Sequence, residues 1–464
     1  MSIQSQSDTQ TNHEHCQLPS RLFSRVIKLA FPVALQSALV AILALADVLM
    51  VSDFGQTATA AVGIASRWHF VAIMIMAALA TATGTLVSQY WGRDDKETAK
   101  TITMQSLKFG SMIMIPVTVL MVGFGSQIMR LQTDDLLVIQ QGADYLLYSL
   151  PLLMLTHWVI TAEASLRSSG NAVLPLILAA ITIAINIGLN FWLIHGGLGV
   201  PALGVAGAAL STTIARVVQV TLIYGVLRYQ KHWLIISDYQ KNNPRLWQSY
   251  QRLAVPNAYN AVLWAFGTLT YQMIYGHMGT TELAVYSMIG PFEGLCYAIF
   301  MGISVACSVL LGQALGRDEY RQARAMSKFF IKCIIGMGIF TCALLLLQRD
   351  NVIRFLDLNS PNFAGIADPA FIVMSFAIII RMLNMLIING ILRAGGENHF
   401  CLRMDFIAMW MVGLPLTAYG AFIAELSFAW VYLLMMSEEI VKLALCFNRY
   451  LQRKWLNNLT IATT

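Results

Sequence analysis

The sequence predicts an all-α polytopic membrane protein with twelve transmembrane helices in two pseudo-symmetric bundles of six. Three observations lead to this fold class: the composition is apolar, long segments carry no charge, and the second half repeats landmarks of the first. Of 464 residues, 57% are apolar and 12% are charged, about half the charged fraction of an ordinary soluble domain. The composition therefore excludes a soluble enzyme, a nucleic-acid-binding protein and a disordered scaffold.

Twelve apolar segments, separated by Gly, Pro and charged residues, are each long enough to cross a membrane. No Asp, Glu, Lys or Arg occurs in 168–215, 253–281 or 294–316. A spanning helix needs about 20 mostly apolar residues. The pattern predicts helices near 22–51, 60–88, 101–126, 139–166, 172–195, 202–229, 250–276, 282–312, 323–347, 366–394, 400–423 and 427–449.

Basic residues lie mainly in the connections on one side of the predicted membrane. With the N-terminus inside, the outer connections carry only Arg130, Arg349 and Arg354 among the Lys and Arg residues. Because cytoplasmic loops are enriched in Lys and Arg, we expect both termini in the cytoplasm. Residues 1–20 are polar and lack the apolar core of a signal peptide, so we expect a disordered tail there.

Motifs of the first half recur in the second half in the same order. The pattern Gln-x-x-Gly-Arg-Asp occurs at 89–94 and again at 313–318. The pattern Leu-Arg-x-x-Gly occurs at 166–170 and again at 392–396, so the two pairs of motifs are separated by nearly equal lengths of chain. Repeats of this kind identify a duplicated architecture.

The duplication divides the chain into an N-lobe at 21–229 and a C-lobe at 250–450. A cytoplasmic linker at 230–249 joins them, and a cytoplasmic tail follows at 451–464. Because six helices return the chain to the same side, the repeats are parallel, an arrangement that secondary transporters use. The sequence holds no GxxxxGKS or GxxxxGKT motif for ATP, so we expect an ion gradient as the energy source.

Several further marks identify a family. Pro32 is followed by Ala46-Asp47-Val48, and the segments Asn186-x-x-x-Asn190 and Gly207-Ala-Ala-Leu-Ser-Thr212 lie in the fifth and sixth helices. With the duplicated motifs, the chain from about 20 to 450 resembles the multidrug and toxic compound extrusion (MATE) transporters of the MOP superfamily.

The resemblance implies a bacterial inner-membrane antiporter of twelve helices that needs no cofactor. Such proteins export small organic cations and amphipathic drugs in exchange for H⁺ or Na⁺. We expect membrane lipid as a further partner, no nucleic acid, and a monomer.

Asp47 is the first candidate for cation coupling, since a carboxylate in an apolar helix is costly unless it is paired or protonated. The resemblance implies that Asn186, Asn190 and Thr212 surround it. Their amide and hydroxyl oxygens suit either Na⁺ at Asp47 or hydrogen bonds to a protonated carboxyl group. The alternatives are an aspartate solvated by lipid headgroups and polar residues that only join neighbouring helices.

Other candidates lie in the same lobe. Pro32 is a predicted hinge of the first helix, since proline removes one backbone hydrogen bond. Gln36 shares a helical face with Asp47 and is a candidate for the substrate cavity. Glu163 and Arg167 have the spacing and order of a favourable ion pair.

The C-lobe departs from the sodium-dependent NorM branch of the family. The position of that branch's glutamate in the seventh helix is Trp264 here, and no aspartate occurs at 370–392 in the tenth. Tyr271 is the counterpart of Asp47 at the offset of the Gln-x-x-Gly-Arg-Asp motifs, so the duplicated position holds no acid. We therefore expect coupling in the N-lobe and favour H⁺ over Na⁺.

The C-lobe nevertheless carries charges within its helices. We expect Arg381 to pair with Glu293 or Asp405, which would neutralise a costly burial; a second proton or substrate-cation site is the alternative. Polar and aromatic residues of the seventh helix suit an amphipathic cation, although helix packing explains them equally well. The C-lobe candidates for the substrate cavity are Asn260, Trp264, Thr268, Tyr271, Gln272, Arg381 and Asn384.

Two rival functions are weighed against transport of drugs. A lipid-linked oligosaccharide flippase of the same superfamily is the nearest, but it is expected to have more helices and a strongly basic cavity. A non-transport intramembrane protein is the other, and an enzyme of that kind would need a motif such as HExxH, which is absent.

Overall fold

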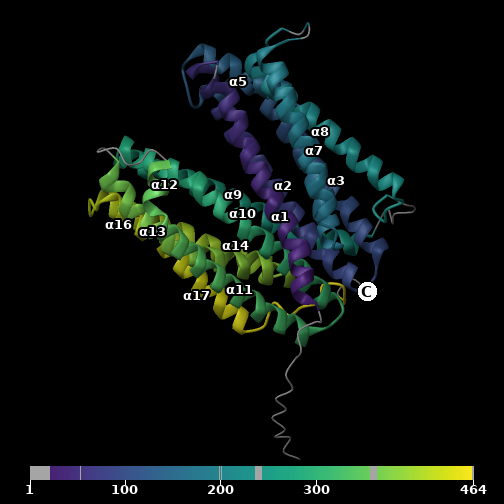
Figure 1. The fold of residues 1–464 in the computed structure, drawn as a ribbon. Coiled ribbons are helices and arrows are strands. Elements are labelled where there is room, and N and C mark those ends of the chain that lie inside the picture. Colours follow the sequence, from purple (N-terminus) through teal and green to yellow (C-terminus); the bar gives the residue numbers. More distant parts are fainter. Residues whose placement is uncertain are drawn as a thin grey trace, which may run out of the picture.

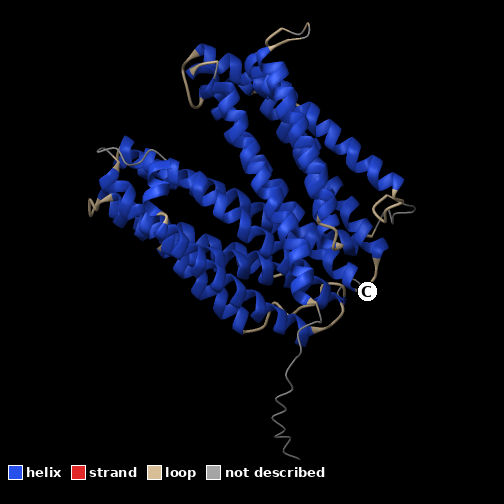
Figure 2. Cartoon of the chain, viewed as in Figure 1, coloured by secondary structure: helices blue, strands red, loops and turns tan. Residues whose placement is uncertain are grey.

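The computed structural model describes residues 21–52, 54–197, 199, 201–235, 243–355 and 363–461. Their regular elements are helices (Figure 2), which confirms the predicted all-α fold class. The expected tail at 1–20 lies outside the described residues, as do 236–242 of the expected linker.

All twelve predicted segments are helical, and several consist of consecutive elements. The first half contains α1 (Leu22–Ser52), α2 (Gln56–Gly92), α3 (Lys96–Gly123), α4 (Gly125–Arg130), α5 (Leu136–Tyr148), α6 (Leu152–Ser168), α7 (Val173–His195) and α8 (Gly204–Tyr229). The second half contains α9 (Pro244–Met278), α10 (Thr280–Gly316), α11 (Tyr320–Leu347), α12 (Arg349–Phe355), α13 (Ala364–Met385), η1 (Leu386–Leu392), η2 (Arg393–Gly395), α14 (Asn398–Asp405), η3 (Phe406–Gly413), α15 (Leu414–Phe422), α16 (Phe428–Met435) and α17 (Ser437–Leu451).

Among the described residues, nine helices are long and apolar enough to cross a membrane, or ten if the bent pair α5 and α6 is one span. The predicted spans that do not pass this test are α9 and the pair α16–α17. Both carry polar side chains that the second half buries: Asn260 on α9, and Glu438 and Lys442 on α17. Such residues lower the apolarity of a segment without preventing it from lying in a helix bundle.

The two halves form the arms of a V (Figure 1). The arms meet near the beginning of α1 and diverge toward α5 in one half and α12 and α16 in the other. Where they meet, α1 packs along α10 and α2 packs along α9. The first turns of α1, including Leu22, Leu29 and Val33, are buried in the same apolar cluster as the second-half helices, so α1 contributes to both arms.

Reciprocal hydrogen bonds join the arms where they meet. The Gln89 Nε2 atom donates to the Ala394 carbonyl oxygen (2.8 Å), and the Gln313 Nε2 atom donates to the Ser168 carbonyl oxygen (3.0 Å). The two donors are the first residues of the duplicated Gln-x-x-Gly-Arg-Asp motifs, and the two acceptors are equivalent residues of the Leu-Arg-x-x-Gly motifs. The duplicated motifs therefore form one pseudo-symmetric interface, which we call the convergent end.

Two glycines allow the close approach at the convergent end. A Cβ atom at Gly92 would collide with the backbone of Gln313, and one at Gly316 would collide with the backbone of Gln89. The residues that follow these helix ends also share a backbone conformation, because Asp94 and its repeat have positive φ angles of 62° and 61°. Aspartate adopts this region more readily than most residues.

The segment after α17 packs against the convergent end rather than extending from it. Trp455 is 1% exposed, and Asn458 is also buried. The Leu459 amide donates to Gln89 Oε1 (2.7 Å), and the Asn458 Nδ2 atom donates to Asp318 Oδ1 (2.8 Å). Hydrogen bonds from Asn458 and Tyr320 hold the pKa of the Asp318 carboxyl below its usual value. The expected tail at 451–464 is thus bound to both lobes as far as the structure describes it.

Candidate functional site

The four residues predicted to couple transport to a cation lie together in the N-lobe. Asp47 is on α1, Asn186 and Asn190 are one turn apart on α7, and Thr212 is on α8. The Asn190 Nδ2 atom donates to Asp47 Oδ1 (2.5 Å) and to Asn186 Oδ1 (3.1 Å). The Asn186 Nδ2 atom donates to Thr212 Oγ1 (3.3 Å). Because α7 packs against both α1 and α8, its polar face meets the other two helices.

Ser211 is a member of this group that sequence reasoning missed. Its hydroxyl donates to Asn190 Oδ1, so the buried Asn190 amide uses both its donor and its acceptor atoms. Its position directly before Thr212 could have indicated it. Successive residues of a helix point in different directions, so the two hydroxyl groups of α8 can reach different side chains of α7. The network fixes Asn190 in position and directs its amide group toward Asp47.

Asp47 forms no ion pair within 4 Å among the described residues. The positive charge that acts on it electrostatically is Arg216, whose Nη1 atom donates instead to Gln219 Oε1 (2.6 Å). The carboxylate is therefore held by an amide and not by a fixed cation. A half-buried carboxylate in an apolar helix is stabilised by binding a mobile cation or a proton when no fixed cation neutralises it.

A second polar group surrounds Glu163 in the N-lobe, nearer the convergent end than Asp47. The carboxylate forms the predicted ion pair with Arg167 (3.3 Å) and also accepts hydrogen bonds from Gln36 Nε2 (2.9 Å) and Gln219 Nε2 (3.3 Å). Gln36 was predicted to line the substrate cavity, but its amide is bound to Glu163. Eleven residues separate Gln36 from Asp47 on α1, which corresponds to about 16 Å along the helix.

The C-lobe contains a buried cluster that sequence reasoning recognised only in part. Lys442 on α17 lies 3.2 Å from Asp405 Oδ1 and 2.6 Å from Glu438 Oε1. Asn260 on α9 donates to Asp405 Oδ2 (2.7 Å), and the Tyr271 hydroxyl donates to Glu438 Oε2 (2.6 Å). Asp405 was one of two alternative predicted partners of Arg381, and the structure pairs it with Lys442.

Arg381 occupies a neighbouring group of its own. It pairs with Glu293, one of its two predicted partners, and lies 3.9 Å from Glu439 Oε1. The Asn384 Nδ2 atom donates to the side chain and to the backbone carbonyl of Glu439 (both 2.8 Å). The helix that carries Arg381 continues into the π-helical turn η1, and Asp405 directly precedes the π-helical turn η3. Turns of this type are frequent at functional sites.

The predicted substrate residues of α9 lie in different surroundings. Asn260 and Tyr271 on α9 face the buried C-lobe charges, whereas Trp264 is 41% exposed and approaches Phe70 of α2 (6.4 Å between ring centres). The Thr268 hydroxyl donates to the Trp264 carbonyl oxygen of its own helix (2.9 Å). Gln272 is half-buried. The predicted residues of α9 therefore lie on two sides of the helix. Asn260 and Tyr271 point into the C-lobe, whereas Trp264 lies on the side that faces the N-lobe.

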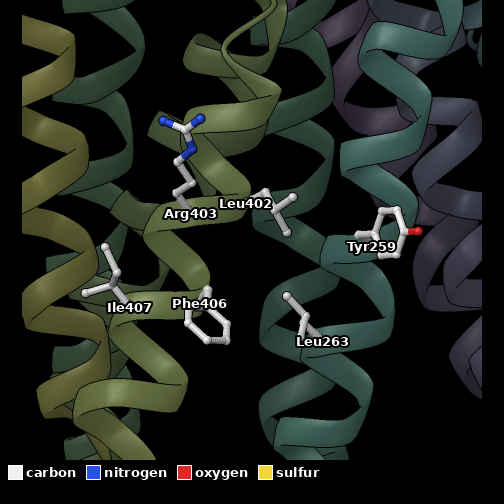
Figure 3. Close-up of a pocket in the computed structure, with 6 residues that line it drawn as sticks. All are labelled: Tyr259, Leu263, Leu402, Arg403, Phe406 and Ile407. Carbon is white, nitrogen blue, oxygen red and sulfur yellow. The ribbon is translucent and has the colours of Figure 1, made fainter.

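A pocket of about 400 Å³ lies between α9 and the α14–η3 segment (Figure 3). It is lined by Tyr259, Leu263, Leu402, Arg403, Phe406 and Ile407. Its lining is mostly apolar and contains no acid, and it includes none of the predicted site residues. Its chemistry suits an acyl chain better than an organic cation.

Comparison with known proteins identifies the family. A family model described as MatE matches residues 32–192 and 256–419. The uncharacterized transporter YisQ of Bacillus subtilis is 23% identical over 436 residues, which cover 93% of this chain and 94% of that protein. The probable multidrug resistance protein NorM of Bacillus subtilis is 21% identical over 413 residues, 86% of this chain and 90% of that protein.

The fold also matches a solved structure described as the outward-facing conformation of a multidrug resistance MATE family transporter of the MOP superfamily. The TM-score is 0.84 at 18% identity, with 93% of this chain and 95% of that chain covered. The two segments matched by the family model begin at Pro32 and Pro256, which are separated by the same length of chain as the two Gln-x-x-Gly-Arg-Asp motifs. Together these segments make up more than half of the sequence. The chain therefore belongs to the MatE family of multidrug and toxic compound extrusion transporters.

Proposed function

We propose that this protein is a secondary active antiporter of a bacterial inner membrane that exports cationic or amphipathic organic compounds in exchange for H⁺ bound at Asp47. The observation that carries the proposal is the carboxylate of Asp47, held by the Asn190 amide at 2.5 Å without an ion pair among the described residues. A carboxylate at membrane depth is costly in its charged form. Proton binding removes that charge, so the two protonation states favour different surroundings.

The hydrogen-bond pattern favours H⁺ over Na⁺ as the coupling ion. Sodium needs several oxygen ligands, and the candidates beside Asp47 are the amide oxygens of Asn186 and Asn190 and the Thr212 hydroxyl. Asn190 Oδ1 already accepts from Ser211, and Asn186 Oδ1 accepts from Asn190. A sodium ion would need several of these oxygens to turn their second lone pairs toward one point beside Asp47, whereas a proton needs only the carboxylate.

The mechanism that we propose begins at the side where the arms diverge. A proton from outside neutralises Asp47, which weakens its hold on Asn190 because a neutral carboxyl group accepts a weaker hydrogen bond than a carboxylate. Helix α1 is then free to repack, with Pro32 as the point of bending. The substrate leaves toward the outside, and the arms rock to open the convergent end toward the cytoplasm.

Dye efflux tests this proposal. A fluorescent organic cation is loaded into vesicles that carry the protein, and a proton gradient or a sodium gradient is imposed separately. Asp47→Asn keeps the size of the side chain but cannot bind the proton, so gradient-driven efflux should stop while the protein remains folded. The matched control is Asp94→Asn, since the Asp94 side chain is 85% exposed in a loop. Normal efflux by Asp47→Asn would overturn the proposal, and sodium-driven efflux would change the ion assignment alone.

A further inference from the structure

The two lobes carry a cation at equivalent positions, the half-buried Arg216 and the buried Lys442. Arg216 on α8 and Lys442 on α17 are separated by the same length of chain as the repeated Leu-Arg turns. The residue four positions before each is also equivalent, Thr212 in one lobe and Glu438 in the other. The last helix of each lobe therefore presents the same pair of positions, but an acid replaces the hydroxyl in the C-lobe.

In the first helices of the lobes, the acid lies in the N-lobe and the hydroxyl group lies in the C-lobe. Asp47 on α1 corresponds to Tyr271 on α9 at the offset of the repeated Gln-x-x-Gly-Arg-Asp motifs. The tyrosine hydroxyl donates to Glu438 Oε2 (2.6 Å), so the C-lobe keeps a carboxylate at the junction of its first and last helices. That carboxylate is carried by the last helix instead of the first.

The two cations differ in what they bind. Arg216 donates to Gln219 and leaves Asp47 with an amide partner. Lys442 places its ammonium group 3.2 Å from Asp405 and 2.6 Å from Glu438. One lobe therefore holds a carboxylate that lacks a bound cation, and the other holds two carboxylates with a cation between them.

The surroundings of the Lys442 ammonium group are those of a bound monovalent cation. Its side chain is 8% exposed and that of Glu438 is 6% exposed. The second oxygen of each carboxylate is held by a neutral donor, Asn260 at Asp405 and Tyr271 at Glu438. These donors orient the two remaining oxygens toward one point, and the ammonium group fills that point. Removing the lysine from such a buried group leaves uncompensated negative charge, and binding of another cation would stabilise it.

We propose that the Lys442 ammonium group is a tethered cation that fills a cation site at the junction of the first and last helices of the C-lobe, where the N-lobe has Asp47 and Thr212, so that a free ion binds in the N-lobe alone. The position itself is a site for a monovalent cation or a primary ammonium ion, occupied by a side chain of the protein. The statement that a free ion binds only in the N-lobe rests on the proposed function. The statement that Lys442 occupies a cation site in the C-lobe does not.

Chemical rescue tests the tethered cation. Lys442→Ala removes three methylene groups and the ammonium group, which together have the size of propylammonium. The thermal midpoint of the purified variant is measured with propylammonium, Na⁺ or K⁺ against N-methylglucamine at equal ionic strength. We expect propylammonium to raise the midpoint saturably by about 2–4 °C. Lys442→Met fills the space of the lysine stem and leaves no room for propylammonium, and Lys328→Ala removes an exposed lysine, so neither should respond to propylammonium.

A failure of all three cations to raise the midpoint of Lys442→Ala would overturn the proposal, as would an equal rise with propylammonium in Lys442→Met. Asp47→Asn with native Lys442 provides a second measurement that does not depend on the folding of the alanine variant. Because its C-lobe site is already filled, its midpoint should show no saturable response to Na⁺, K⁺ or propylammonium, and a response would contradict the inference. Dye efflux by Asp47→Asn tests the proposed function separately, so the two failures are distinguishable.

Discussion

Replacing Gly316 by alanine should push the two arms apart at the convergent end. The new methyl group would meet the backbone carbonyl group of Gln89. Backbone cannot rotate away as a flexible side chain can, so the strain must be relieved by movement of α10 against α2. Overpacking of this kind costs about 1–3 kcal/mol, which corresponds to about a 5- to 150-fold shift in an equilibrium between two conformations. We expect the shift to favour the state in which the convergent end is open.

Spin labels measure the separation directly. Labels at Asp94 and Lys328, both exposed, report the distance between the two halves by double electron–electron resonance in a background without native cysteines. The longer-distance population should increase in Gly316→Ala. Gly336→Ala is the matched control, because a methyl group at Gly336 in α11 meets no atom within 4 Å and should stabilise the helix by about 0.5–1 kcal/mol. Identical distance distributions in both variants and the native protein would refute the reasoning.

Three further changes have defined outcomes. Asn190→Ala removes the donor to Asp47, and a hydrogen bond to a charged group is worth about 1.5–3 kcal/mol, so dye efflux should fall at least about tenfold; unchanged efflux would argue against a role for the amide. Trp455→Ala should lower the free energy of unfolding by about 3–5 kcal/mol, measured by chemical denaturation, because the buried indole stacks on Tyr450 with centres 5.9 Å apart; a loss below about 1 kcal/mol would contradict the packing. Because the pKa of Asp318 is lowered from its ordinary value of 3.8, its carboxylate stabilises the C-terminal segment fully above that value and progressively less as the pH falls through the lower pKa of the folded state. Protection of this segment from hydrogen exchange should decrease over that range, and protection that stays unchanged until the carboxyl group is fully protonated would contradict this.

The members of the N-lobe site could be picked out from the sequence, but their grouping around Asp47 was implied by the resemblance to the MATE transporters. Asn186 and Asn190 share a helix face at a spacing of four, and Asp47 is conspicuous as an acid in an apolar helix. The C-lobe cluster was harder to predict. Lys442 looks like the partner of Glu438 on its own helix, and nothing local shows that Asp405 also reaches it, because that contact depends on how α14 packs against α17.

The convergent end was likewise only partly predictable from the sequence. The duplicated motifs around Gly92 and Gly316 were evident from the sequence, but the structural role of these motifs was not. Only the structure shows that each glycine faces the backbone of the other repeat and that the segment carrying Asn458 and Leu459 binds both Gln-x-x-Gly-Arg-Asp motifs. A polar segment at the end of a chain has the composition of a free tail, and its partners lie far away in the sequence.

The sequence by itself determined the fold class, the number of helical segments, the duplication and the prominence of Asp47. Each of these follows from hydropathy, helical spacing or self-similarity, which are properties of neighbouring residues or of whole segments. The tertiary structure decided which charges meet, that Lys442 neutralises Asp405 and Glu438, and that Asp47 keeps an amide partner instead. These contacts depend on the rotation and depth of each packed helix, and a charged side chain carries no local mark of the partner it will find.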